Sequence, residues 1–244
     1  MIDLHCFSGL GNSAAVAALL QKFLPPDFED SVWVFPVYAW GVPPIVIEEI
    51  KETDFDGKTV HMVCTCGSET GHIDRQWSRL VTEHGGIVGG IYSVVMPRSY
   101  VFMPFMNTDS EKIVRQKLLN TETRVKEIAD NIINRRHIVD LHLGPFPGFL
   151  SRVVYPWFFK TLMKTKNYHT SAKCKGCGIC ARSCPYGNIT MTDNGRPQWG
   201  DKCTWCLRCY HACPSHCVNY WRFSRRKGQY HHPDFTLPPK EKQN

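Results

Sequence analysis

The chain has 244 residues, of which 43% are hydrophobic, a content typical of a globular protein rather than a disordered one. Its net charge of +7 is unevenly placed, because residues 171–244 hold 12 Lys and Arg against 4 Asp and Glu, whereas residues 1–170 are nearly neutral. The chain opens with neither a basic segment nor a long apolar run, which argues against a secretory signal, so we expect a protein of the reducing cytoplasm.

The first predicted element is an apolar strand over residues 2–7, which leads through a loop of small residues into an alanine-rich helix over 14–24. Unpaired N–H groups and the positive end of the helix dipole would face this loop, an arrangement that binds phosphate. Gly9 and Gly11 let the backbone close around an anion. The loop lacks the third glycine of a dinucleotide fingerprint and the Gly-Lys-Ser/Thr of a P-loop, and an ordinary tight turn is the alternative. Its side-chain donors would be Ser8, Asn12 and Ser13.

Three further strands are predicted, and helices separate them. Strands that alternate with helices indicate a parallel, doubly wound α/β sheet, whose ligand lies outside the carboxyl ends of the strands. The loops that follow the first three strands would therefore share one edge of this sheet. The predicted strands cover residues 31–37, 59–65 and 86–96. Helices are predicted over 45–51, from after residue 71 through 81, and over 109–134.

The loops after the second and third strands differ in character. The second offers two aromatic rings, Tyr38 and Trp40, and the third, over residues 66–71, is rich in backbone donors. A phosphate loop, a stacking wall and backbone donors together suit a flat phosphorylated ring system such as FMN. The alternative for both aromatics is hydrophobic packing beneath the loop.

The segment over residues 96–106 follows the carboxyl end of the fourth strand and is apolar and aromatic. In one interpretation it forms the substrate wall, where Arg98 holds an anionic group and Tyr100 is a catalytic proton donor. In the other it is a plug between sheet and linker. Farther along, the apolar stretch 148–163 is too short to span a bilayer and suggests a linker helix, with a membrane-surface helix as the alternative.

Two cysteine runs, over residues 174–185 and 203–214, share the spacing C-x2-C-x2-C-x3-C-P. This is the spacing of bacterial two-cluster ferredoxins, in which three cysteines of a run bind one 4Fe–4S cluster and the fourth binds the other. Structural zinc would explain neither the third cysteine nor the proline. Cys217 falls outside both sets and is expected to be a small buried residue. The predicted ligand sets are Cys174, Cys177, Cys180 and Cys213 for one cluster, and Cys203, Cys206, Cys209 and Cys184 for the other.

The loops also resemble those of a known family. Residues 7–13, FSGLGNS, resemble the FSGTGNT phosphate loop of flavodoxins, with Leu10 in the usual threonine position. Residues 35–43 and 64–71 resemble the two loops that bind the flavin ring. Residues 96–100, MPRSY, resemble an M-P-x-x-Y that recurs after the last strand.

Together with the cysteine runs, these motifs make the chain similar over nearly all of residues 1–222 to the flavodoxin–ferredoxin fusion proteins of anaerobes, the iron–sulfur flavoproteins. The resemblance implies a flavodoxin-like sheet, a two-cluster ferredoxin domain, and one FMN beside the clusters. The implied FMN-binding residues are Ser8, Gly9, Leu10, Gly11, Asn12, Ser13, Pro36, Val37, Tyr38, Ala39, Trp40, Gly41, Thr65, Cys66, Gly67, Ser68 and Gly71.

One departure from flavodoxins is visible. Only residues 25–30 separate the first helix from the second predicted strand, where a flavodoxin has another strand and helix. About four parallel strands are therefore expected, with an open edge beside the first strand that dimerisation or docking of 135–170 would cover. The expected domains are an FMN-binding domain over 1–134, a helical linker over 135–170, a ferredoxin domain over 171–222 and a basic, solvated tail over 223–244.

Three functions follow from these patterns. The first is a reductase that passes single electrons through two 4Fe–4S clusters to FMN and then to a small, anionic substrate. The second is a non-catalytic relay between larger redox proteins, for which the basic end would dock an acidic partner. The third and weakest is a redox-sensing regulator, since no nucleic-acid recognition motif accompanies the basic tail.

Overall fold

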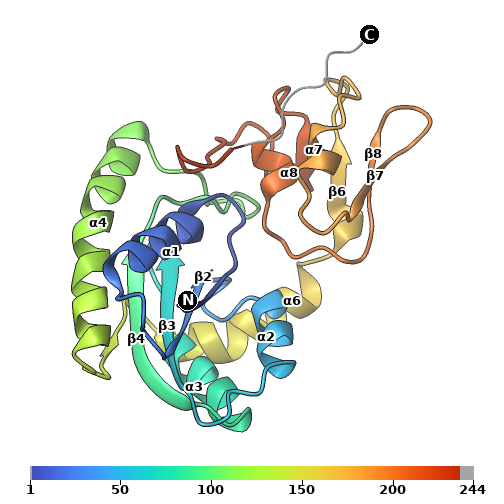
Figure 1. Cartoon of the computed structure of the whole chain (residues 1–244). Helices are drawn as coiled ribbons and strands as arrows, with labels where there is room; N and C mark the ends of the chain where they lie inside the picture. The colour runs from blue at the N-terminus through green and yellow to red at the C-terminus, as the bar shows by residue number, and fades with distance from the viewer. Residues whose placement is uncertain (1, 237–244) are drawn as a thin grey trace. The chain divides into compact units, whose positions relative to one another are not determined.

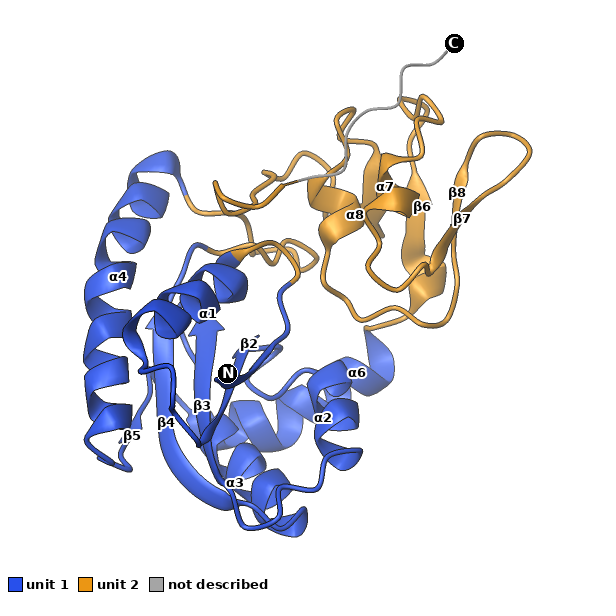
Figure 2. Ribbon diagram, in the orientation of Figure 1, with its two compact units in different colours: residues 1–8, 12–97, 110–162 blue, residues 9–11, 98–109, 163–244 orange. Residues whose placement is uncertain are grey.

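The structure is a computed structural model that describes residues 2–236, so the last eight residues of the expected basic tail lie outside it. The chain divides into two compact units, and each is described by itself (Figures 1 and 2). Two short segments of the expected FMN domain belong to the second unit. Within the described range, unit 1 comprises residues 2–8, 12–97 and 110–162, and unit 2 comprises residues 9–11, 98–109 and 163–236.

Unit 1 is a five-stranded parallel sheet with helices, which is compatible with a flavodoxin-like α/β fold. All four predicted strands are present, and a fifth strand of two residues was not predicted. The strands follow one another in chain order across the sheet: β1 (Asp3–Cys6), β2 (Ser31–Pro36), β3 (Thr59–Cys66), β4 (Ile87–Val95) and β5 (Val139–Asp140). The helices that connect them are α1 (Asn12–Phe23), α2 (Pro44–Lys51), α3 (Ile73–Glu83) and α4 (Glu111–Ile133).

Helices cover both faces of this sheet. Val32 and Val34 pack toward α1 and α4, whereas the alternate side chains Trp33 and Phe35 contact Trp77 of α3 on the other face. When parallel strands follow one another in chain order, connections on one face of the sheet are right-handed and connections on the other face are left-handed. Two of the four connections are therefore left-handed and not the usual right-handed crossover. Removing the second strand from the flavodoxin order 2-1-3-4-5 leaves this sequential order, which fits the short connection over residues 25–30.

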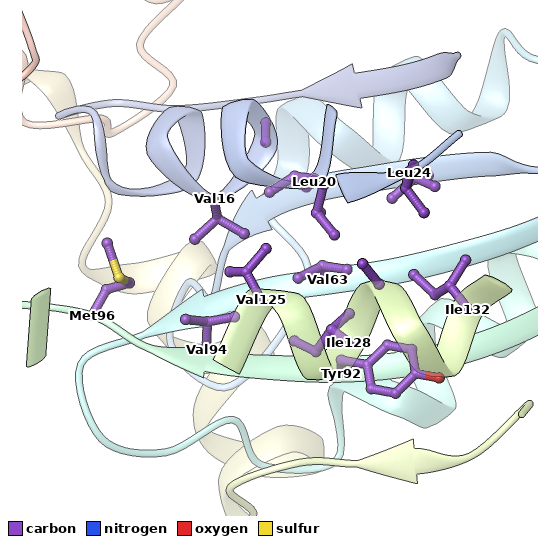
Figure 3. Packing of buried hydrophobic residues seen from close by; sticks show 14 residues of the cluster. Val16, Leu20, Leu24, Val63, Tyr92, Val94, Met96, Val125, Ile128 and Ile132 are labelled. Atoms are coloured by element: carbon purple, nitrogen blue, oxygen red, sulfur yellow. The ribbon is translucent and has the colours of Figure 1, made fainter. Parts of the chain in front are cut away.

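The core between the sheet, α1 and α4 holds unit 1 together (Figure 3). Val16 and Leu20 of α1 lie four residues apart, as do Val125 and Ala129 of α4, so each helix presents one apolar stripe to the sheet. Full burial of a valine or leucine side chain stabilises a fold by about 1.5–3 kcal/mol relative to exposure. The core residues are Val16, Ala17, Leu20, Leu24, Val32, Val34, Val63, Tyr92, Val94, Met96, Val125, Ile128, Ala129 and Ile132.

Strand β1 is an edge strand, as the sequence predicted, but residues 135–170 do not cover it. Their strand β5 pairs with β4 at the opposite edge of the sheet. Charged side chains protect β1 instead: Lys58 Nζ donates to Asp3 Oδ2 at 2.9 Å, and the His5 ring lies 3.1 Å from Glu49 Oε1. A short strand with charges along it is a poor template for pairing with another chain.

A buried histidine makes the stability of unit 1 depend on pH. His61 Nδ1 accepts a hydrogen bond from Gly90 N at 2.9 Å, and Nε2 lies 3.1 Å from Asp30 Oδ2. Burial lowers the pKa of His61 below its ordinary value of 6.5, so below that pH the unfolded chain takes up a proton that the folded chain resists.

We therefore expect the free energy of unfolding to fall as pH drops below 6.5, with His61 contributing up to about 1.4 kcal/mol per pH unit. Urea titrations followed by tryptophan fluorescence at several pH values would measure this slope. His61→Gln should flatten the slope, and His142→Gln, at an exposed position, should not. Equal slopes in all three proteins would contradict the assignment to His61.

After β5 the chain forms one continuous helix over residues 147–161. It consists of α5 (Pro147–Phe149), a π-helical segment (Leu150–Val154) and α6 (Tyr155–Thr161). The helix lies within unit 1, and the role of linker stays a prediction. Over residues 2–236 we find no helix with the length and apolar character needed to cross a bilayer.

Candidate iron–sulfur site

Unit 2 is built from two equivalent halves that were not recognised in the sequence. Each element of the first half recurs 29 residues later in the second half. The halves are joined because β6 pairs antiparallel with β9, and β7 with β8. The recurring pairs are β6 (Tyr168–Thr170) with β8 (Pro197–Trp199), α7 (Ile179–Arg182) with α8 (Arg208–His211), and β7 (Ile189–Met191) with β9 (Val218–Tyr220).

The loops that carry the cysteines repeat the same backbone conformation. At three positions the first half has a glycine with positive φ, and the second half has a larger residue in the same left-handed region. A left-handed conformation costs a non-glycine residue roughly 1–2 kcal/mol. The structure of the loop therefore imposes this conformation, because the second half adopts it without glycine. The matched residues and φ values are Gly176 (68°) and Trp205 (59°), Gly178 (68°) and Leu207 (59°), and Gly187 (59°) and His216 (45°).

These loops bring the eight predicted cysteines together around two cavities. Each cavity encloses about 320 Å³ of space free of atoms, including solvent at its mouth. Among the described residues, no three His, Cys, Asp or Glu side chains converge on a point that could hold a single metal ion. A cubane spreads its four thiolates over four iron corners, so its ligands surround a volume rather than a point. Cavity I is lined by Cys174, Cys177, Cys180 and Cys213, and cavity II by Cys184, Cys203, Cys206 and Cys209.

Two polar side chains of cavity II indicate that the cavity fits a polar guest. Tyr168 Oη and Trp199 Nε1 are buried, and the groups that they face are ligand thiols: Tyr168 interacts with Cys203 and Trp199 with Cys209. A buried donor that is left unpaired costs about 1–3 kcal/mol, so such groups normally have a partner. Thiolate and sulfide sulfur atoms of a bound cluster would accept these bonds. Outer-shell donors of this kind also tune the potential of a metal centre.

Burial also affects the thiols themselves. It raises the pKa of Cys180 and Cys203 to about 11, and it raises the pKa of Cys209 well above the ordinary value. These thiols therefore carry protons at neutral pH when no iron is bound. Since iron binds the thiolate, cluster insertion must release the protons.

The crossing cysteine of each half receives the same backbone hydrogen bond. Asn188 N donates to Cys184 Sγ at 3.4 Å, and Cys217 N donates to Cys213 Sγ at 3.4 Å. Cys217 is buried, as predicted, but its sulfur lies 3.3 Å from Cys213 Sγ and its side chain lines cavity I. Hydrogen bonds to ligand sulfur raise the potential of an iron–sulfur cluster.

Each cavity has one cationic residue in its lining, Lys175 in cavity I and Arg208 in cavity II. Arg208 Nε also donates to Gly9 O at 2.8 Å. Gly9 itself packs so closely that a Cβ added to it would lie 2.6 Å from the Cys206 carbonyl oxygen. Part of the predicted phosphate loop is therefore in direct contact with a predicted cluster ligand.

The other two residues of this part of the loop are also packed within unit 2. Leu10 O accepts a hydrogen bond from His232 N at 2.8 Å. A Cβ on Gly11 would meet the Cβ atoms of His232 and Phe235 at 2.7 Å. Ser224, Tyr230 and His232 are all buried. The expectation of a solvated tail is therefore wrong for these three residues.

Part of the predicted substrate wall lies in the core of unit 2. Val101 and Phe102 are buried, and the Phe102 ring stacks on Tyr220 with centroids 4.8 Å apart. The centroids of Phe102 and Tyr210 lie 5.6 Å apart. Burial raises the pKa of Tyr100, so its phenol holds its proton more firmly than an exposed tyrosine. This packing favours the interpretation of the segment as a plug over that of an open substrate wall. The core that the segment fills is the core of unit 2.

The remaining FMN-binding candidates lie at the carboxyl edge of β1, β2 and β3 in unit 1. Hydrogen bonds join their loops: Ser13 Oγ lies 2.8 Å from Thr65 Oγ1, and Trp40 Nε1 donates to Glu69 Oε2 at 3.4 Å. Asn12 Nδ2 donates to Pro97 O at 2.9 Å, so the predicted phosphate donors Asn12 and Ser13 both have partners within the protein. The candidates in unit 1 are Ser8, Asn12, Ser13, Pro36, Val37, Tyr38, Ala39, Trp40, Gly41, Thr65, Cys66, Gly67, Ser68 and Gly71.

The second loop has a defined conformation. Tyr38 N donates to Gly41 O and Gly41 N donates to Tyr38 O, both at 3.0 Å, which closes a two-residue turn. Ala39 and Trp40 at its tip have positive φ values of 46° and 69°, the pattern of a type I′ turn. The turn leaves both aromatic rings half-buried, which is compatible with stacking on a flat ring.

Sequence reasoning missed several residues that shape the cavities. Tyr168 and Trp199 stand outside the cysteine runs, and Phe102 is far from them in the sequence. A signal for the first two was available, because all four cysteine positions of the runs repeat with a period of 29 residues and so do β6 and β8. No sequence signal distinguished Phe102 from other aromatic residues of its segment.

Comparison with known proteins agrees with this geometry. Residues 166–214 match the family of 4Fe-4S dicluster domains. No curated protein and no solved structure matches the chain. The matched range contains both cysteine runs and most of the residues that line the two cavities. Residues 166–214 are therefore a 4Fe–4S dicluster domain, which supports a role in iron–sulfur electron transfer.

Proposed function

We propose that this chain is an iron–sulfur flavoprotein that exchanges electrons with a redox protein and passes them to a small substrate. In this proposal the cysteines of cavities I and II hold one 4Fe–4S cluster each, and the FMN-binding residues predicted from the sequence hold one FMN. The observation that carries the electron-transfer part is the arrangement of eight cysteines around two cavities, with the fourth cysteine of each run in the cavity of the other.

When bound, the clusters would supply one-electron chemistry and the flavin would accept one or two electrons. The protein residues position these groups and set their electrostatics. Lys175 and Arg208 stabilise the more negative reduced state of the clusters, which raises the potential. Gly9, one of the predicted FMN-binding residues, packs within unit 2 against Cys206, which lines cavity II. The positive charge of residues 171–244 favours an acidic redox partner.

Cofactor content tests the proposal directly. Anaerobically purified protein should contain roughly eight irons and one FMN per chain, with matching acid-labile sulfide. Iron, sulfide and flavin assays with an absorbance spectrum would measure this. Eight irons without flavin, even after incubation with FMN, would contradict the FMN part of the proposal. The proposed electron-transfer role of the cluster domain would stand.

A charge placed in the phosphate loop should remove FMN and leave the iron unchanged. Ser8→Asp adds a carboxylate beside the expected phosphate, and two unit charges 4 Å apart repel by about 4 kcal/mol near a protein surface. We expect FMN affinity to fall by about 100-fold or more, measured by fluorescence titration of the flavin-free protein. Ser110→Asp is the matched control, because Asp caps a helix as well as Ser does and residue 110 precedes α4. Equal affinities in both variants would contradict a phosphate site at this loop.

One observation favours the relay as a second candidate. The segment proposed as the substrate wall buries Val101 and Phe102 in the core of unit 2, and Tyr100 holds its proton firmly. Catalytic roles for Arg98 and Tyr100 remain a prediction of the reductase proposal. Dithionite-reduced protein should be reoxidised rapidly by a small molecule if the chain is a reductase, and only by redox proteins if it is a relay.

A further inference from the structure

The helix over residues 147–161 presents an apolar stripe to solvent. The exposed fractions are 80% for Phe146, 60% for Phe149, and 52% for both Val153 and Trp157. The last three are spaced four residues apart, and the π-helical segment between Phe149 and Tyr155 widens the turn, which keeps such side chains nearly in line. We call Phe146, Phe149, Val153 and Trp157 the outer stripe.

The inner side of the same helix is fixed to unit 1 by other residues. Ser151 Oγ donates to Trp40 O at 2.9 Å, and Tyr155 Oη donates to Val42 O at 2.6 Å. Phe158 is buried. These three residues face away from the outer stripe by helical spacing. The outer stripe is therefore not needed to attach the helix, which holds it in a defined orientation.

The charged side chains of the segment that carries the outer stripe have one sign. No Asp or Glu occurs between Asp140 and Asp193. Within this range Arg152 and Lys160 are exposed on the helix, and Lys164 follows it. A helix with aromatic residues on one side and cations beside them has the composition of a segment that lies in a membrane interface.

We propose that the outer stripe docks this protein on an anionic lipid bilayer, with the helix parallel to the membrane surface. Phe146, Phe149 and Trp157 would enter the headgroup region, where aromatic rings are favoured, and Arg152 and Lys160 would contact lipid phosphates. The proposal goes beyond the electron-transfer function and does not depend on FMN.

A second copy of the chain is a poorer occupant of the same surface. A twofold contact would bring together two copies of a segment that carries Arg152 and Lys160 and has no acidic residue to neutralise them. An anionic bilayer meets both properties of the surface at once, because apolar side chains enter it and cations remain at its headgroups.

Vesicle flotation of the full-length, cluster-loaded protein tests the proposal. Binding is expected to vesicles that contain phosphatidylglycerol, to fall as salt rises, and to be weak for phosphatidylcholine alone. The double variant Phe149→Ser with Trp157→Ser should bind at least tenfold more weakly. Arg152→Gln and Lys160→Gln should each weaken binding about fivefold. Leu119→Ser, which is 79% exposed on α4, and Lys126→Gln on the same helix are the matched controls and should bind normally.

Iron content and an unfolding curve would show that each variant is folded. If the double serine variant does not fold, the exposed charge variants still decide the question. The proposal is overturned if the intact protein does not bind anionic vesicles, or if the stripe and charge variants bind as the controls do. It is also overturned if the stripe variants instead change the sedimentation coefficient without affecting lipid binding, which would assign the surface to a second copy.

Discussion

Cys184→Ala combined with Cys206→Ala is expected to leave one cluster, with roughly four irons per chain, whereas Cys184→Ala combined with Cys180→Ala is expected to leave none. The reason is the crossed arrangement of the cavities. Cys184 and Cys206 line cavity II together, so their loss removes the ligands of a single cluster. Cys180 lines cavity I, so the second pair damages both sites. Anaerobic iron and sulfide assays on the purified variants would measure the difference.

The two double variants distinguish crossed ligation from the simpler arrangement in which each run binds its own cluster. Under that arrangement the outcomes would be exchanged, because Cys180 and Cys184 belong to the same run. Cys6→Ala is a suitable control, since Cys6 is exposed on β1 and should leave roughly eight irons bound. Alanine is used because serine oxygen can replace a thiolate as an iron ligand.

Phe102→Ala is expected to lower the free energy of unfolding of unit 2 by about 3–5 kcal/mol, the usual cost of removing a buried phenylalanine side chain. Phe102 is 1% exposed and lies among Tyr168, Tyr210 and Tyr220, with the Tyr168 centroid 5.5 Å away. The alanine would leave a cavity next to a residue that lines cavity II, so we also expect faster loss of the clusters on heating. Anaerobic thermal scans of cluster absorbance, with an iron chelator present, would record this.

Phe105→Ala is the matched control for this prediction. Phe105 lies three residues farther along the same segment and is 99% exposed, so its removal should change stability by less than about 0.5 kcal/mol. Phe102→Leu, which keeps most of the volume, should fall between the two. Similar behaviour of the Phe102 and Phe105 variants would contradict the assignment of this segment to the core of unit 2.

Much of the fold of unit 1 follows from local sequence. The apolar runs that become β2, β3 and β4 were recognisable because strands buried on both faces consist of nearly continuous apolar residues. Strand β5 was not predicted, because a strand of two residues has no periodicity to detect. The length of the connection over residues 25–30 predicted the edge position of β1, since the chain is too short there for another strand and helix.

The candidate cluster site was the most predictable part, because ligand spacing is a local property. The two residues between successive cysteines limit the distances between the thiolates of one loop. In the structure the eight cysteines line the two cavities in the two groups that this spacing predicted. The outer groups of the site were not predictable in this way. Tyr168 and Trp199 reach cavity II only because β6 and β8 fold beside it.

Sequence by itself determined the cysteine chemistry, the parallel sheet and the charge asymmetry, because each depends on residue type and spacing along the chain. Only the tertiary structure decided that residues 9–11 and 98–109 belong to unit 2, because they contact residues that are distant in the sequence. It also decided which side of the 147–161 helix faces solvent. An apolar residue can lie equally well in a protein core or in an interface. The neighbouring residues that the fold brings to it determine which of the two it occupies.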